Sequence, residues 1–230
     1  MALLGKGALV IWHGMTAEGD EEMMRWHNRE HVAERVGVPG FLRGRRYAHS
    51  ARPREYLDLY ETESVDTIRS EPYLARLNNP TPWTQRVLPH FRDTVRLGCR
   101  VLASSGRGQG GGLLTLRLHS PAGGEAMLQE ALTGQGLAFV RQLGEVVGVH
   151  VLETVAETTR IRTAEGKLKG GEVAEAEKPC PFVLLVETSD PRIAEALATG
   201  PLHPERLAAH GVASGAVVDT YRLQLSMDRE

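Results

Sequence analysis

The sequence has few cysteines, few aromatic residues and no long apolar run. Two of its 230 residues are cysteine, Cys99 and Cys180, without the CxxC spacing of a redox pair or the Cys/His spacing of a zinc site. We therefore expect two reduced thiols and a cytoplasmic protein. The apolar run at residues 7–14 is far shorter than the roughly 20 residues that span a bilayer, and no leader-type cleavage pattern follows it. The sequence therefore predicts no membrane partner.

An excess of charge of either sign is also missing. The 27 Lys and Arg residues nearly balance the 29 Asp and Glu residues, for a net charge of −2 with neutral histidines. Because a nucleic-acid-binding surface needs basic groups that neutralise phosphates, this balance predicts no nucleic-acid partner. Hydrophobic residues make up 41% and charged residues 24%, a composition typical of a folded globular protein and not of a disordered chain.

The second half of the sequence repeats the pattern of the first half. Residues 57–62 (LDLYET) and 184–188 (LLVET) are apolar strand-like runs that end in Glu-Thr and precede a segment able to form a helix. Further strand-like segments correspond to each other before and after these runs, residues 7–14 with 112–120 and residues 95–105 with 217–226. Each half therefore reads strand, helix, strand, strand, helix, strand.

This order is that of the split βαβ, or ferredoxin-like, unit, an α+β fold with an antiparallel sheet and helices on one of its faces. The other face of each sheet is left uncovered, so we expect the two sheets to pack against each other. The Gly- and Ser-rich residues 104–112 predict the boundary between a first repeat, residues 1–104, and a second, degenerate repeat, residues 112–230. A charged, glycine-rich stretch at about residues 159–179 predicts a mobile loop in the second repeat.

Residues suited to proton chemistry are concentrated in the first repeat. All three Trp, four of five Tyr and five of nine His lie before residue 104, so we expect a binding site there and a scaffold role for the second repeat. His27 and His31 have the i, i+4 spacing of one helical face, with Glu30 and Glu34 beside them. Polar groups between a helix and its sheet cost free energy unless a cavity with water or ligand pairs them. We predict catalytic roles for His27, His31 and Glu30; the alternative is an outward, solvated face.

Residues 27–31 also match the HxxEH pattern of inverted zinc peptidases. Such a site needs a third protein ligand in a suitable helix. The segment where that ligand would fall holds Arg107 and several glycines. We therefore predict no metal site.

Strand-like alternation predicts which side chains share a face of the sheet. One face of residues 41–49 carries Phe41, Arg43, Arg45, Tyr47 and His49, and one face of the next strand carries Tyr56, Asp58 and Tyr60. The sequence leaves open which face meets the helices. The predicted substrate-binding residues, for which packing or solvation is the alternative, are His13, Arg46, Tyr47, Tyr60 and Trp83, the last as a lid.

Part of the first repeat resembles the signature of EthD-like proteins. The matching residues are Trp26-His27-Asn28-Arg29-Glu30-His31, then Glu34-Arg35, then Val38-Pro39-Gly40-Phe41, and the strand Arg43–Tyr47. EthD-like proteins belong to the dimeric α/β-barrel superfamily, together with cofactor-independent monooxygenases, polyketide cyclases, muconolactone-type isomerases and haem-binding chlorite dismutases. The resemblance covers about residues 5–103. It implies that the two repeats form an intrachain dimeric α/β barrel with a pocket between helix and sheet, lined by His31 with Glu30 next to it.

The cluster of imidazoles and carboxylates favours an enzyme without a bound cofactor. His27 or His31 would remove a proton α to a carbonyl in a small, mostly apolar, aromatic or lactone-like molecule, for an isomerisation, cyclisation or oxygenation. One alternative is a non-catalytic binding or accessory protein of EthD type. Another is a haem protein of chlorite-dismutase type, with an axial ligand from among His150, His203 and His210. Sheet surfaces of this kind also allow a homodimer.

Overall fold

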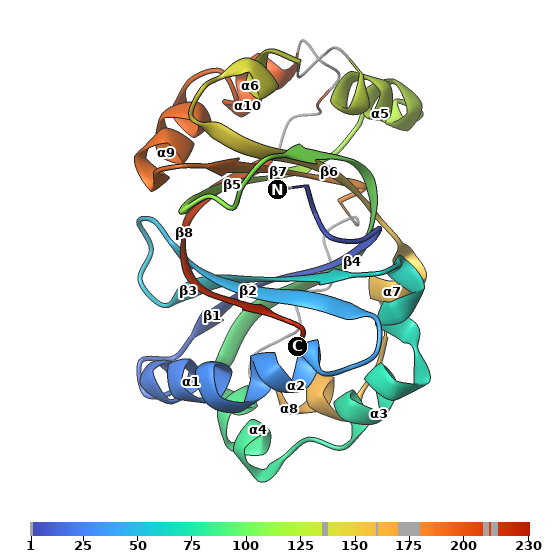
Figure 1. The fold of residues 1–230 in the computed structure, drawn as a ribbon, viewed down its shortest axis with the longest axis vertical. Coiled ribbons are helices and arrows are strands. Elements are labelled where there is room, and N and C mark those ends of the chain that lie inside the picture. Colours follow the sequence, from blue (N-terminus) through green and yellow to red (C-terminus); the bar gives the residue numbers. More distant parts are fainter. Residues whose placement is uncertain (1, 135–137, 160, 170–179, 209–211, 213–215) are drawn as a thin grey trace.

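A closed barrel of antiparallel strands forms the centre of the molecule. The computed structural model describes residues 2–134, 138–159, 161–169, 180–208, 212 and 216–230. In this part of the chain eight strands close in the order β1-β3-β2-β8-β5-β7-β6-β4 (Figure 1). They are β1 (Gly7–Met15), β2 (Phe41–His49), β3 (Glu55–Thr62), β4 (Phe91–Gly106), β5 (Gly112–Leu118), β6 (Val146–Thr154), β7 (Phe182–Thr188) and β8 (Val217–Asp228).

The barrel consists of two sheets joined edge to edge. The first half of the chain forms the order β4-β1-β3-β2 and the second half forms β8-β5-β7-β6. β2 pairs with β8 and β4 pairs with β6, so each half covers both sheet edges of the other. The predicted α+β class, with two ferredoxin-like units closed into one barrel, is confirmed. An origin of the halves by duplication, with a boundary at residues 104–112, stays a prediction.

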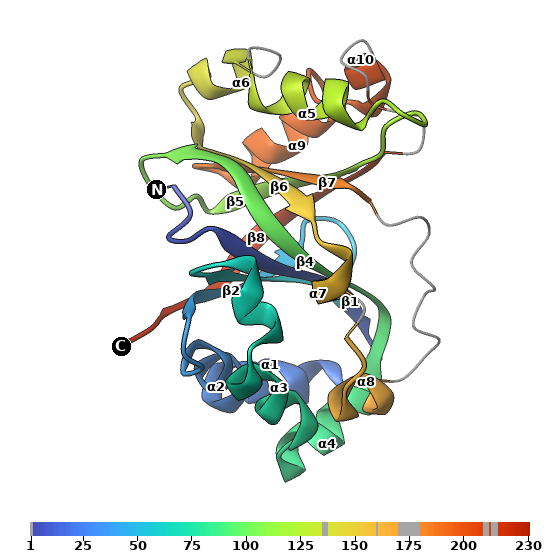
Figure 2. The same cartoon turned by 90° about the vertical axis from the view of Figure 1, so that its right-hand side faces the viewer.

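Helices cover the barrel on two opposite sides (Figures 1 and 2). One layer lies on the first sheet and contains α1 (Asp20–Trp26), the π-helical turn η1 (His27–His31), α2 (Val32–Val36), η2 (Val65–Arg69), α3 (Glu71–Asn78), α4 (Pro82–Val87), η3 (Leu88–His90) and α8 (Ala164–Leu168). The other contains α5 (Glu125–Thr133), α6 (Ala138–Gln142), α9 (Pro191–Thr199) and α10 (Pro204–Leu207), while α7 (Ala156–Thr159) lies beside β4. Among the described residues no helix is long and apolar enough to cross a membrane.

The interior of the barrel is one apolar core that both halves share. Val10, Leu57 and Leu97 enter it from the first half, and Leu113 and Leu185 enter it from the second half. Removing apolar surface from water stabilises a fold by about 25 cal/mol per Å². Because each inner face is covered by the other, the two halves gain this stabilisation together.

A buried ion-pair network connects the two halves inside the barrel. Arg45 of β2 donates hydrogen bonds of 2.8 Å to Glu61 of β3 and to Glu187 of β7, and none of the three side chains is more than 2% exposed. Glu61 and Glu187 are the acidic residues of the two Glu-Thr repeats. Burial raises the pKa of Glu187, but hydrogen bonds from His150 and Arg45 outweigh this effect and lower the pKa to about 2. The repeated dipeptide therefore places one carboxylate from each half against the same guanidinium group.

The predicted alternation along residues 41–49 is wrong at its first residue. The register between β2 and β3 shifts between Phe41 and Arg43, as at a β-bulge. Phe41 consequently packs with Tyr60 in the cluster on the helix side, whereas Tyr47 lies in the barrel interior. The face that carries Tyr56, Asp58 and Tyr60 on β3 is the one that meets the helices.

We expect Arg45→Met to destabilise the protein by roughly 3–5 kcal/mol, because the substitution removes the guanidinium group that donates hydrogen bonds to two buried carboxylates. The measurement is the free energy of unfolding in urea. Arg100→Met is the matched control, since Arg100 is 53% exposed and pairs with Glu153 at the surface. It should cost at most about 1 kcal/mol. Equal losses for the two variants would contradict the role assigned to Arg45.

Candidate functional site

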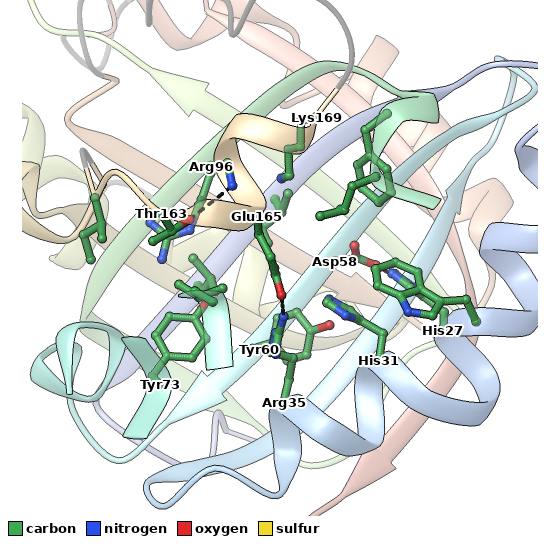
Figure 3. A pocket seen from close by; sticks show the side chains of 18 residues that line it. His27, His31, Arg35, Asp58, Tyr60, Tyr73, Arg96, Thr163, Glu165 and Lys169 are labelled. Carbon is green, nitrogen blue, oxygen red and sulfur yellow. Dashed lines mark hydrogen bonds and ion pairs between the residues drawn. The ribbon is translucent and has the colours of Figure 1, made fainter. Parts of the chain in front are cut away.

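A cavity of about 90 Å³ lies between the first sheet and its helix layer (Figure 3). We call it the histidine cavity. Strands β1, β3 and β4, the helical segment around His27, and α3 and α8 all contribute to its walls. Its lining residues are Leu9, Ile11, Trp26, His27, His31, Arg35, Asp58, Tyr60, Tyr73, Leu77, Leu88, Phe91, Arg96, Ile161, Thr163, Glu165, Gly166 and Lys169.

A π-helical turn presents the two histidines to this cavity. The amide of Val32 donates to the carbonyl of His27, five residues earlier, where an α-helix would use a separation of four. In this wider turn the rings of His27 and His31 stack with a centroid distance of 5.2 Å and an angle of 9° between their planes. Trp26 covers the other side of His31, with a centroid distance of 3.9 Å. Both imidazoles are therefore held by ring contacts.

Asp58 of β3 supplies a buried carboxylate beside the histidines. Its Oδ2 lies 3.1 Å from Nε2 of His13, and its Oδ1 lies 3.7 Å from Nδ1 of His27. Burial raises the pKa of Asp58, but His27 and His13 outweigh it, so the pKa falls below its ordinary value. Burial lowers the pKa of His27 to about 3 and that of His31 well below its ordinary value. At neutral pH the site therefore combines a carboxylate with neutral imidazoles at His27 and His31.

Several buried polar atoms at the histidine cavity have no hydrogen-bond partner among the described residues. They are Nδ1 and Nε2 of His27, Nδ1 of His31, Oδ1 of Asp58, the hydroxyl of Tyr60, Nη1 of Arg35 and Nη2 of Arg96. A buried polar group without a partner costs about 1–3 kcal/mol, and most such groups in proteins are satisfied. These atoms can form hydrogen bonds with water or with a ligand that enters the cavity.

A segment from the second half of the chain, around α8, forms one wall of this cavity. Glu165 of α8 accepts a hydrogen bond from Arg35. At the start of α8, the Thr163 hydroxyl accepts a hydrogen bond from the backbone amide of Gly166. Lys169 follows α8, with its ammonium group 5.3 Å from the ring centroid of Phe91. These residues belong to the stretch predicted as a mobile loop, in which residues 160 and 170–179 lie outside the described residues. No pattern in the sequence of this stretch indicates a part in the site.

The predicted catalytic residues do not all line the histidine cavity. His27 and His31 do. Glu30 faces elsewhere, where it accepts hydrogen bonds from Nε1 of Trp26 at 3.2 Å and from the Thr81 hydroxyl at 2.6 Å. Glu30 therefore fixes the position of Trp26, the residue that stacks on His31.

The predicted substrate-binding residues lie in four different places. Tyr60 lines the histidine cavity, and His13 contacts Asp58 behind it. Arg46 donates to Asn28 and Gln224, and Tyr47 accepts from Arg45 inside the barrel. Trp83 donates to Glu22 at 2.8 Å and lines a separate pocket with Arg25, Asn28 and Arg29.

Sequence reasoning missed four charged residues of the cavity, which are Arg35, Arg96, Glu165 and Lys169. Asp58 could have been found, because its alternation with Tyr56 and Tyr60 is visible in the sequence. For Glu165 and Lys169 no sequence signal was available, since the segment around them has no apolar period. Over the described ranges there is no group of three or more His, Cys, Asp or Glu residues placed to hold a metal ion.

No protein-family model matches the chain, and no curated protein matches its sequence. Solved structures match its fold over nearly its whole length. An anthrone oxidase-like protein has a TM-score of 0.63 at 15% identity, covering 100% of this chain and 96% of its own. A haem-binding protein from Thermus thermophilus has a TM-score of 0.52 at 12% identity, covering 98% and 93%.

A third structure comes from Listeria monocytogenes, an uncharacterised ferredoxin-fold protein related to antibiotic biosynthesis monooxygenases. Its TM-score is 0.50 at 11% identity, with 97% of each chain covered. At such identities the likeness shows the fold alone. The chain has the fold of dimeric α/β-barrel proteins.

We expect the His27 imidazole to stay neutral from pH 7 down to about pH 4, because burial disfavours its charged form. Nitrogen chemical shifts of His27, measured by NMR against pH, test this expectation. In the unfolded chain the imidazole takes up a proton near pH 6.5, so His27 lowers the stability of the fold as the pH falls from about 6.5 towards 3. A His27 titration centred between pH 6 and 7 would show that the ring is not desolvated.

Proposed function

We propose that the protein is an enzyme that removes a proton from carbon in a small, mostly apolar, aromatic or lactone-like molecule, without a bound cofactor. The observation that carries this proposal is the set of unpaired buried polar atoms of His27, His31, Asp58 and Tyr60 at one cavity. A general base, a group that stabilises its protonated form and a donor for the developing oxyanion are the parts that such a reaction needs.

His27 is the proposed base. A proton on Nδ1 would point towards the Asp58 carboxylate, 3.7 Å away, and would leave Nε2 as the free acceptor. When Nε2 takes a proton from the substrate, the Asp58 carboxylate stabilises the imidazolium that forms. Burial raises the pKa of Tyr60 well above its ordinary value, so its hydroxyl keeps its proton and can donate to an enolate oxygen.

The enolate has more than one chemical fate. Reprotonation at another carbon is an isomerisation. In an oxygenation the carbanion gives electrons to dioxygen, one oxygen atom bonds to the carbon, and the other leaves as water with the two hydrogens removed from that carbon. The fold shared with an anthrone oxidase-like protein is compatible with the second fate. A cavity of about 90 Å³ holds about one ring, so a fused three-ring substrate would need a wider cavity.

Binding without turnover is the second candidate function, and one observation favours it. The pKa of His27, about 3, makes it a weak base in the free protein, whereas general bases work best with a pKa near the ambient pH. The same cavity would then serve a carrier or an accessory protein. A specific relationship to EthD-like proteins and the formation of a homodimer are two further proposals.

The described residues do not fit haem. The histidine cavity, about 90 Å³, is much smaller than a porphyrin ring system. His150 lies inside the barrel, where its two ring nitrogens are within 2.9 Å of the Ser104 hydroxyl and 3.2 Å of the Glu187 carboxylate. His203 is exposed and caps α10, and His210 lies outside the described residues. No step of the proposed reaction therefore involves haem.

We expect the protein to accelerate exchange of the C3 protons of α-angelica lactone, a single-ring lactone in which these protons lie α to the carbonyl, in D₂O, measured by the loss of their proton NMR signal. His27→Asn should lower the enzymatic rate about a hundredfold to ten-thousandfold, the usual contribution of a general base. His203→Asn is the control, because it removes an exposed imidazole while asparagine can still cap α10. It should leave the rate unchanged.

Equal rates for His27→Asn and the unmodified protein would exclude His27 as the base. Tight binding of the lactone without accelerated exchange would contradict an enzyme acting on this substrate class and would favour a binding protein. Isothermal titration calorimetry on the same samples measures the binding.

A further inference from the structure

The charged side chains that line the histidine cavity do not balance. Three are cationic, Arg35, Arg96 and Lys169, and two are carboxylates, Asp58 and Glu165. Arg35 has carboxylate partners, since it donates to Glu165 from Nη2 and has a Glu34 oxygen 3.3 Å from Nη1. With both lining histidines neutral, the side chains that line the cavity carry one positive charge in excess, and Glu34, which is not part of the lining, lies beside Arg35.

Arg96 and Lys169 are the cations without a carboxylate partner. Arg96 of β4 uses Nη1 to donate to the carbonyl of Thr158 at 2.6 Å, while its Nη2 is buried and has no partner among the described residues. Lys169 lies over the Phe91 ring and forms no ion pair with any described carboxylate. Desolvation and the charge of Arg96 lower the pKa of Lys169 to about 8, against the opposing effects of Glu165 and Asp58. Two adjacent cations thus keep unused donors at the cavity.

These cations and the proposed base lie at different parts of the same cavity. Figure 3 shows Arg96 and Lys169 on the side of α8, and His27 and His31 on the helical segment across from them. Apolar side chains, among them Leu9, Ile11, Leu77 and Leu88, form the rest of the lining. A volume of about 90 Å³ gives room for several water molecules or for one small ring.

We propose that the histidine cavity selects a single-ring molecule that carries an oxyanion, a carboxylate or a phenolate, held by Arg96 and Lys169 while its ring lies against the apolar lining. This inference rests on the proposed function, because it names the substrate class of the same site. Hydrogen bonds between charged groups are about twice as strong as neutral ones, and desolvation at the cavity increases the effect. An anion also supplies the partner that the two cations lack within the described chain.

Benzoate and benzamide are the probes, because they have nearly the same shape and differ in charge. We expect the unmodified protein to bind benzoate at least about tenfold more tightly than benzamide, measured by isothermal titration calorimetry at pH 7. Lys169→Met and Arg96→Met should each reduce the affinity for benzoate by about tenfold and leave that for benzamide nearly unchanged. Arg100→Met is the matched control, since Arg100 also lies on β4 but is exposed and pairs with Glu153.

The pH dependence of benzoate binding gives a second, independent readout. The titratable and charged groups that face Lys169 are Arg96 of β4, Glu165 of α8, Asp58 of β3, Arg35 of α2 and His31 of η1. Because its pKa is about 8, Lys169 loses its charge between pH 7 and pH 9, and the affinity of the unmodified protein for benzoate should fall over this range. The fall should be absent in Lys169→Met, which has no ammonium group to titrate.

If the unmodified protein binds benzoate no more tightly than benzamide, the anion selectivity is overturned. The same holds if the ratio of benzoate affinity to benzamide affinity is equal in Lys169→Met and in the unmodified protein. Failure of the proposed function has a different signature. In that case His27→Asn leaves proton exchange unchanged while the preference for benzoate persists. Preference for benzoate in the His27→Asn variant therefore supports the anion selectivity whatever the exchange rate shows.

Discussion

Two half-chains close the barrel around the ion pairs of Arg45 with Glu61 and Glu187. This filled interior determines where in the molecule a functional site can lie. The buried guanidinium group of Arg45 pairs with one carboxylate from each half, so these contacts connect the two sheets in one register. The apolar side chains around this network fill the interior. The cavity with proton-active groups therefore lies outside the barrel, between a sheet and its helices.

The two helix layers differ in polarity although the strands beneath them correspond. Counted back from the shared Glu-Thr, Leu184 of β7 stands where Asp58 stands in β3. Counted from the glycine that begins each strand, Leu118 of β5 stands where His13 stands in β1. Leu118 and Leu184 pack in the apolar cluster of the second layer. The two layers thus share a backbone arrangement and differ in these side chains. The first layer has a carboxylate and an imidazole at a polar cavity, and the second has leucines in an apolar core.

The second half nevertheless takes part in the site of the first half. The chain that follows β6 crosses from its own half to the first layer, where α8 lies (Figure 2). Residues of α8 line the cavity there. Glu165 neutralises Arg35 there, so the buried cation of one half has its counter-ion in the other. The same segment adds the ammonium group of Lys169 next to Arg96. The division into a half with the site and a scaffold half, which residue composition suggested, therefore does not describe this cavity.

The sequence by itself determined the order of strands and helices, the α+β class and the segment that carries His27 and His31, because periodicity and the Glu-Thr repeat are local properties of the chain. It also placed Tyr60 and Asp58 on one strand face. Only the tertiary structure decided that this face meets the helices, that Glu30 turns to Trp26, and that Tyr47 lies inside the barrel. The sequence also did not indicate the contribution of Glu165. Its partner Arg35 is 130 positions away in the chain, and no local pattern records a contact over that separation.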